Sequence, residues 1–204
     1  MKRTSVVLLG SITVAAAIVS SQAHATIYHT DTLNVSLPTV FGTGSGSAFE
    51  IVQDDQTLSD FTMGSTLVTA LGSDATVQFT RAFLNPPTNT FDYYAMTITA
   101  AAASFLAPGT YTLSYVINDQ TADKGDWISA ALSSYNATVV SPDLYKTFVN
   151  GSKTYTLNNT TGTSTSVSLL AGTEQLQVTD TITVYPGLNS DLSSFTDSYT
   201  HSRG

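Results

Sequence analysis

Apolar and polar residues alternate with a period of two over several stretches of the chain. In "TYTLSYVIN" (110–118), Tyr111, Leu113, Tyr115 and Ile117 fall on one face, and residues with hydroxyl groups dominate the other. Comparable alternation occurs in 76–83, 91–99, 153–159 and 176–184. Because successive side chains of a strand point to opposite sides, this pattern predicts half-buried β-strands.

Turn-forming sequences separate these runs, among them "NPPTN" (85–89), "APG" (107–109) and "YPGLNSD" (185–191). Helical periodicity comes closest in "LVTALGSDA" (67–75) and "AAAASFLA" (100–107), but both stretches stop at turn residues or proline. Roughly ten to twelve short strands, without alternation of strands and helices, predict an all-β chain. We expect an antiparallel β-sandwich of the jelly-roll or Ig-like type.

The N-terminus has the layout of a secretory signal peptide. Lys2 and Arg3 precede an apolar run at 6–20, and small residues at Ala23 and Ala25 form an A-x-A-like cleavage site. A retained membrane anchor is the alternative, but the run is shorter than the roughly 20 residues that cross a bilayer. We therefore predict export, with cleavage after Ala25 and no membrane span thereafter.

The predicted organisation is a signal peptide at 1–25 and a single β-sandwich domain at 26–204. The chain has 15 acidic and 7 basic residues, and two of the basic residues lie in the leader. The mature chain would keep 5 basic residues against the same 15 acidic ones, a formal charge of −10. Such a chain would be repelled by nucleic acid. It has no cysteine, and its length suffices for one core without disulfides.

Two stretches resemble a known class of exported bacterial proteins. "FLAPGTYTLSYVIND" (105–119) is similar to a tyrosine-rich strand of secreted β-sandwich modules. "LQVTDTITVYPG" with "LSSFTDSYTH" (176–201) resembles the final strand pair of β-sandwich surface proteins with a PEP-CTERM sorting tail. The sorting motif itself does not follow His201 in this sequence. The resemblance implies an extracytoplasmic surface or matrix role, and it brings no catalytic residue.

Two charged residues interrupt apolar faces of predicted strands. Asp180 shares a face with Val178 and Ile182, and Arg81 shares one with Phe79. A buried charge is tolerated when it is paired and hydrogen-bonded. We therefore predict a buried ion pair between Arg81 and an inward carboxylate, with Asp180 as the first choice and Asp92 as the second. A β-bulge that turns either side chain outward is the alternative.

The stretch "NDQTADKGDW" (118–127) is the best candidate for a binding loop. It gathers oxygen ligands of the kind that calcium prefers, at Asn118, Asp119, Asp123 and Asp126. The spacing does not match an EF-hand, and Lys124 opposes a cation, so a solvated acidic loop is the alternative. Trp127, which stands beside the loop, is a candidate platform for a sugar ring or else a core residue. No other cofactor is expected.

Candidate catalytic residues are scarce in the sequence. The predicted mature chain has two histidines, His29 and His201, which we expect to be solvated near its ends. It contains no G-x-S-x-G or H-E-x-x-H motif. We therefore predict a non-enzymatic, secreted surface or extracellular-matrix protein with a structural or interaction role.

Two other functions remain open from the sequence. One is a carbohydrate-binding module, for which Trp127, Tyr93 and Tyr135 would have to form an exposed platform. The other is a pilin-like subunit that polymerises by strand donation. The segment 26–37 is a possible donor because Ile27, Leu33, Val35 and Leu37 share a face in an extended chain. Polysaccharide and self-association are accordingly the expected partners.

Overall fold

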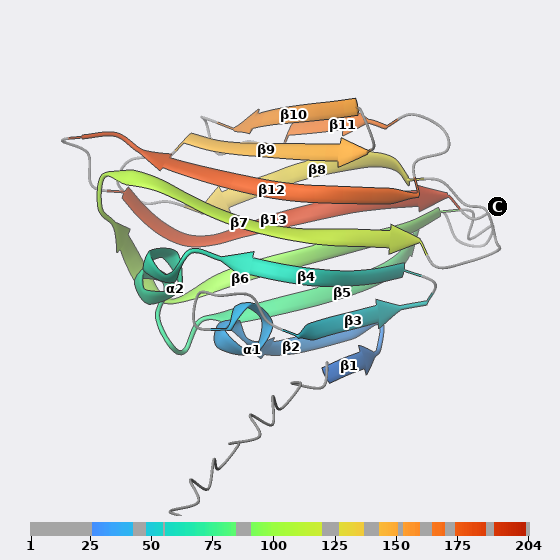
Figure 1. Ribbon diagram of the computed structural model, residues 1–204, viewed down its shortest axis with the longest axis horizontal. Helices are drawn as coiled ribbons and strands as arrows, with labels where there is room; N and C mark the ends of the chain where they lie inside the picture. Colours follow the sequence, from blue (N-terminus) through green and yellow to red (C-terminus); the bar gives the residue numbers. More distant parts are fainter. Residues whose placement is uncertain are drawn as a thin grey trace, which may run out of the picture.

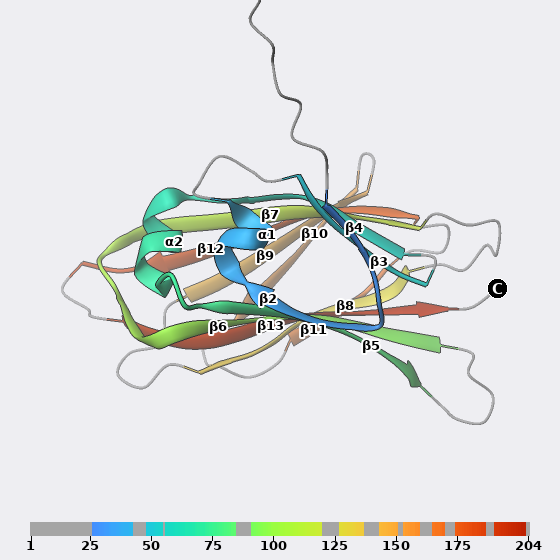
Figure 2. The ribbon, with the colours of Figure 1, turned by 90° about the horizontal axis from the view of Figure 1, so that it is seen from below.

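A computed structural model describes residues 26–42, 48–54, 56–84, 91–119, 127–136, 143–150, 153–159, 165–169, 174–186 and 190–202. Within these ranges the chain forms two packed sheets and two short helices (Figures 1 and 2). The seven-stranded sheet has the order β1 (Thr26–His29), β3 (Phe49–Gln53), β4 (Gln56–Met63), β7 (Gly109–Asp119), β12 (Gln175–Val184), β9 (Asp143–Asn150) and β10 (Lys153–Asn159). The six-stranded sheet has the order β11 (Thr165–Ser168), β8 (Trp127–Asn136), β13 (Ser190–Ser202), β6 (Phe91–Leu106), β5 (Thr76–Leu84) and β2 (Thr32–Ser36). The predicted all-β sandwich is confirmed.

The last eight strands have the topology of a jelly roll. β6 pairs with β13, β7 with β12, β8 with β11 and β9 with β10, so each pair is nested inside the previous one. All four pairs are antiparallel, as in a long hairpin that has been rolled up across two sheets. Of the two sandwich types that the sequence allows, the structure has the jelly roll.

The strands before β6 extend both sheets at one side. β4 and β3 continue the seven-stranded sheet beyond β7, and β1 adds a parallel edge strand beside β3. β5 and β2 continue the six-stranded sheet beyond β6. The proposed donor segment is thus built into its own sandwich. Its shared apolar face ends at Ser36, because Leu37 begins the helix α1 (Leu37–Phe41), and Ile27 is half exposed.

The two C-terminal strands lie in the middle of the sandwich rather than beside one another. β12 is held between β7 and β9, and β13 is held between β6 and β8. The chain therefore passes from one sheet to the other between the end of β12 at Val184 and the start of β13 at Ser190. The last strand pair of the sequence completes both sheets without forming a hairpin of its own.

Strand alternation places the core as predicted. The apolar faces of β6, β7 and β12 are buried between the sheets, and the rings of Phe61 and Phe79 meet there at 5.8 Å. One helix lies where the sequence came closest to helical periodicity: α2 (Ser65–Leu71) buries Leu67 and Leu71 and ends at Gly72. α1 and α2 lie at one end of the sandwich (Figure 2). Neither described helix has the length and apolar character of a membrane span.

Candidate functional site

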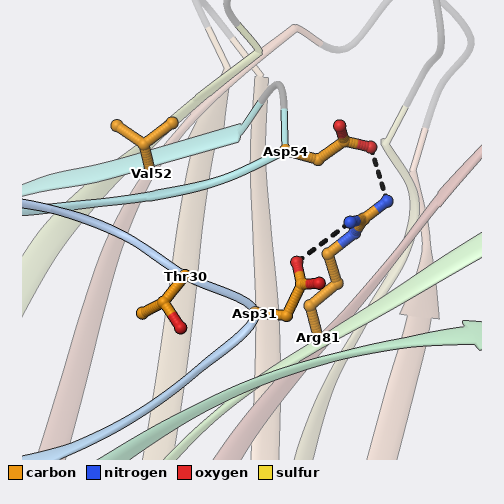
Figure 3. A pocket seen from close by; sticks show the side chains of 5 residues that line it. All are labelled: Thr30, Asp31, Val52, Asp54 and Arg81. Atoms are coloured by element: carbon orange, nitrogen blue, oxygen red, sulfur yellow. Dashed lines mark hydrogen bonds and ion pairs between the residues drawn. The ribbon is translucent and has the colours of Figure 1, made fainter.

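Arg81 lies toward the C-terminal end of β5 and binds three carboxylates, two of which, those of Asp31 and Asp54, are drawn in Figure 3. Its Nη1 donates to Asp31 Oδ1 at 3.0 Å, and its Nη2 donates to Asp54 Oδ2 and, at 3.3 Å, to Asp92 Oδ2. The Arg81 side chain is only 7 % exposed and that of Asp92 only 1 %, whereas Asp31 and Asp54 are 64 % and 45 % exposed. We call these four residues the Arg81 clamp.

The clamp joins turns and strands from both sheets. Asp31 stands where the chain crosses from β1 in one sheet to β2 in the other, and its carbonyl accepts hydrogen bonds from the Arg81 backbone at 2.7 Å and from Gln53 Nε2 at 3.0 Å. Asp54 follows β3 with a φ of 60°, in the left-handed region that aspartate tolerates better than most residues. Asp92 lies near the start of β6, the strand paired with β5. One guanidinium therefore fixes three segments.

The electrostatic environment keeps Arg81 charged. Burial by itself lowers the pKa of Arg81, but the hydrogen bond with Asp31 and the nearby charges of Asp92 and Asp54 outweigh this effect and raise it above its ordinary value. The guanidinium carbon also lies 4.7 Å from the centre of the Phe83 ring, in a cation–π contact. Arg81 is thus a permanent cation within a cluster whose net charge is negative.

An open hollow of about 390 Å³ adjoins the clamp, lined by Thr30, Asp31, Val52, Asp54 and Arg81. Figure 3 shows the two exposed carboxylates turned toward the guanidinium. Carboxylates accept hydrogen bonds and the guanidinium donates them. In this arrangement the guanidinium of Arg81 donates hydrogen bonds to the carboxylates of Asp31 and Asp54. The cluster therefore serves first as a link between strands.

The structure corrects the first choice of partner for Arg81 and supports the second. Arg81 pairs with Asp92, whereas Asp180 lies on β12 in the other sheet, among buried tyrosines. Sequence alternation was right that both charges face inward. It could not rank the partners, because β5 packs across from β4, through the contact of Phe79 with Phe61, while β12 lies two strands beyond β4.

His201 is buried, which corrects the prediction that it is solvated. Its side chain is 1 % exposed, and its Nε2 lies 3.0 Å from Asp119 Oδ2 and 3.4 Å from Gln56 Nε2. The burial follows from the central position of β13, which brings the end of the chain between the sheets. For His29, the structure describes the backbone of β1. The sequence carried no signal for the His201 contact, which depends on strand order.

The predicted calcium loop is described only where it leaves β7. Asn118 Oδ1 accepts a hydrogen bond from Gln175 Nε2 at 2.6 Å, and the carboxylate of Asp119 turns to His201. Asp123 and Asp126 lie outside the described residues. Trp127 begins β8, and its side chain also lies outside the description, so the predicted calcium and sugar sites stay predictions there. Within the described ranges, no three acidic or histidine side chains gather as metal ligands.

A second polar cluster lies sealed between the sheets. Tyr115 of β7 donates through its hydroxyl to Asp197 Oδ2 at 2.7 Å, and it shares a short hydrogen bond with the hydroxyl of Tyr199 on β13. All three side chains are buried. Burial, and next the charge of Asp197, raise the pKa of both tyrosines well above the ordinary value. We call Tyr115, Tyr199 and Asp197 the tyrosine cluster.

The tyrosine cluster predicts a loss of stability in alkaline solution. Because the pKa of both phenols is raised in the folded state, the unfolded chain gives up these protons at a lower pH than the folded chain does. Their contribution to stability is therefore complete below the ordinary tyrosine pKa of 10.0 and falls as the pH rises above it. Urea unfolding across this range, followed by circular dichroism, measures the effect. A Tyr115→Phe variant should show a shallower dependence, and an equal slope in both proteins would contradict the assignment.

Comparisons with known proteins identify no family for this chain. No family model matches, and no curated protein matches. Among solved structures, TmCBM61 in complex with beta-1,4-galactotriose is similar over 61 % of this chain and 88 % of that one, with 8 % identity and a TM-score of 0.35. FeII HppE is similar over 57 % of this chain and 55 % of its own, with 12 % identity and a TM-score of 0.19. At these TM-scores neither structure bears on the function.

Proposed function

We propose that residues 26–204 form an exported, non-enzymatic β-sandwich with a structural or interaction role at a cell surface or in an extracellular matrix. The Arg81 clamp is the observation that carries this proposal. Its buried guanidinium binds carboxylates from both sheets. The cation of the site is thus used to hold the N-terminal strands in place. The leader-like sequence at 1–25 supports export.

An interaction role is tested with purified residues 26–204. Size-exclusion chromatography with light scattering, with calcium and then with a chelator, measures self-association. Affinity electrophoresis through gels that contain galactan, xylan or hydroxyethyl cellulose measures polysaccharide binding. The proposal predicts association in the first experiment or retardation by a polysaccharide in the second, without release of reducing sugar. A protein that stays monomeric and runs unretarded in every gel, or that degrades a polysaccharide, would contradict it.

Carbohydrate binding is a second candidate, and a hollow at the α2 end of the sandwich favours it. The hollow measures about 380 Å³ and is lined by Ser65, Thr66, Thr69, Ala70, Ala107 and Tyr111. The described lining combines hydroxyl groups, two alanine side chains and one aromatic ring, without a charged side chain. Hydroxyl groups and an aromatic surface suit a neutral sugar, whose hydroxyls need hydrogen bonds and whose C–H faces pack against rings.

Tyr111→Ala should weaken retardation by a bound neutral polysaccharide about tenfold or more, which corresponds to about 1.4 kcal/mol. The reason is that the substitution removes the only aromatic ring of the hollow's described lining. Phe83→Ala is the matched control, since Phe83 is a half-exposed aromatic residue at the other end of the sandwich. Equal losses in the two variants, or none in Tyr111→Ala, would place the binding elsewhere.

A further inference from the structure

Two inner strands of the seven-stranded sheet turn hydroxyl groups to the outside of the sandwich. β7 and β12 run side by side along the sheet (Figure 1), and their residues alternate between buried and accessible positions. The accessible positions include three directly opposed pairs of hydroxyl residues, which are Thr110 with Thr183, Thr112 with Thr181, and Ser114 with Thr179. We call these six residues the hydroxyl face.

The hydroxyl face carries no charge, although the chain is acidic. β7 and β12 contain one charged residue each, Asp119 and Asp180, and both of these side chains are buried. The neighbouring strand β4 contributes the exposed Asp60, at the place where its register with β7 shifts. A face without charge favours a neutral ligand, because it offers nothing that offsets the desolvation of an ion.

Pairing in register extends the hydroxyl face over the neighbouring strands. Thr179 is also opposite Thr147 of β9, and Thr147 is opposite Thr156 of β10. On the other side, Thr62 of β4 is opposite Ser114, and their hydroxyl oxygens lie 2.6 Å apart. Directly opposed side chains of antiparallel strands have Cβ atoms about 4.5–5.5 Å apart. The sheet therefore holds these hydroxyl groups at regular intervals across five strands.

An exposed aromatic residue follows the hydroxyl face at the end of β12. Tyr185 is 49 % exposed and comes directly after Val184, whose side chain is buried. Strand alternation, continued by one residue, places Tyr185 on the same side of the sheet as Thr183. The outward positions from Thr179 to Tyr185 extend over about 20 Å. Such a surface is long enough for several sugar rings in a row, and it combines hydroxyl groups with an aromatic ring.

We propose that the hydroxyl face, together with Tyr185, binds a neutral polysaccharide whose chain lies along β12. This inference rests on the carbohydrate binding proposed above and gives it a second, longer contact surface. Each threonine offers a hydroxyl that donates and accepts hydrogen bonds, and a methyl group that packs against the C–H groups of a sugar. An open face suits a polymer, whereas a single small sugar is held better in a hollow. The two surfaces adjoin, because Tyr111 of the α2 hollow is the residue after Thr110.

Affinity electrophoresis through gels that contain galactan, xylan or hydroxyethyl cellulose tests the proposal. The test variant combines Thr112→Val with Thr181→Val, which removes two opposed hydroxyl groups and keeps β-branched side chains that strands favour. We expect its dissociation constant for the retarding polysaccharide to rise about tenfold. Tyr185→Ala should weaken retardation as well. The matched control combines Thr97→Val with Thr196→Val, an opposed pair on the outer face of the six-stranded sheet with hydroxyl oxygens 2.9 Å apart, and it should be retarded like the wild type.

The possible results separate this inference from the function on which it rests. If the wild type is retarded and the Thr112→Val, Thr181→Val variant is retarded equally, the inference is wrong and carbohydrate binding itself stands. An equal loss in the control pair would also overturn the inference, because the effect would then belong to surface hydroxyl groups in general. A wild type that no polysaccharide retards would contradict carbohydrate binding and this inference with it. Urea unfolding of each variant checks that the sandwich is intact.

Discussion

Replacing Arg81 with alanine is expected to lower the free energy of unfolding by about 3–5 kcal/mol. The substitution takes the guanidinium away from Asp92, whose side chain is 1 % exposed, and it removes the hydrogen bond to the carboxylate of Asp31 at the crossing from β1 to β2. Breaking a buried ion pair from one side leaves a desolvated charge behind, which is why the cost exceeds that of a surface pair. Urea denaturation of the two proteins at neutral pH measures the difference.

Matched variants separate the buried part of the clamp from its exposed part. Asp54→Asn keeps a residue that tolerates positive φ and removes only a half-exposed carboxylate, so its cost should stay below about 1 kcal/mol. A double-mutant cycle of Arg81→Ala with Asp92→Ala should show strong coupling, and one with Asp180→Ala should be additive. Coupling of Arg81 to Asp180 instead of Asp92 would refute the clamp as described.

Phe61→Ala is the second large effect, with an expected cost of about 3–5 kcal/mol. Phe61 is fully buried, and its ring centre lies 5.6 Å from the rings of Phe41, Phe49 and Tyr115 and 5.8 Å from that of Phe79. These partners come from α1 and from strands of both sheets. Truncation would leave a cavity that the surrounding sheets cannot collapse to fill, which adds to the lost transfer free energy.

Phe61→Leu is the control for this prediction. It keeps an apolar side chain of intermediate volume, so it should cost clearly less than Phe61→Ala when both are measured by the midpoint and slope of urea unfolding. If alanine costs no more than leucine, or if both cost less than about 1 kcal/mol, the ring does not occupy the centre of the core.

The fold was readable from the sequence because alternation marks strand faces. The pattern of Tyr111, Leu113, Tyr115 and Ile117 in β7 appears in the structure as predicted, with Tyr111 partly exposed at the end of the strand. Strand order was not readable, because pairing between distant strands leaves no local signal. The nested pairing of β6 with β13, β7 with β12, β8 with β11 and β9 with β10 distinguishes a jelly roll from an Ig-like sandwich. This pairing is visible only in the structure. α2 was missed as a helix because it spans only Ser65–Leu71.

The candidate site was readable in part. An inward charge at Arg81 and the need for a carboxylate followed from the sequence, and Asp92 lies on the next strand, diagonally across from Arg81 and opposite Phe83. Asp31 and Asp54 could not be foreseen, because both lie in turns whose direction depends on the crossing between sheets. The same limit concealed the contact of His201 with Asp119, which joins the ends of two strands 82 positions apart in the sequence.

The proposed function requires that the protein is exported from the cytoplasm. The N-terminus of the exported protein tests this claim most directly. The full chain would be expressed in a bacterial host with an intact secretory pathway, the cells fractionated and the first residue of the protein determined. We predict a chain that begins at Thr26 and is found in the periplasm, at the cell surface or in the medium. A chain that keeps residues 1–25 and stays in the cytoplasm, while a signal-peptide control is exported from the same cells, would contradict the account.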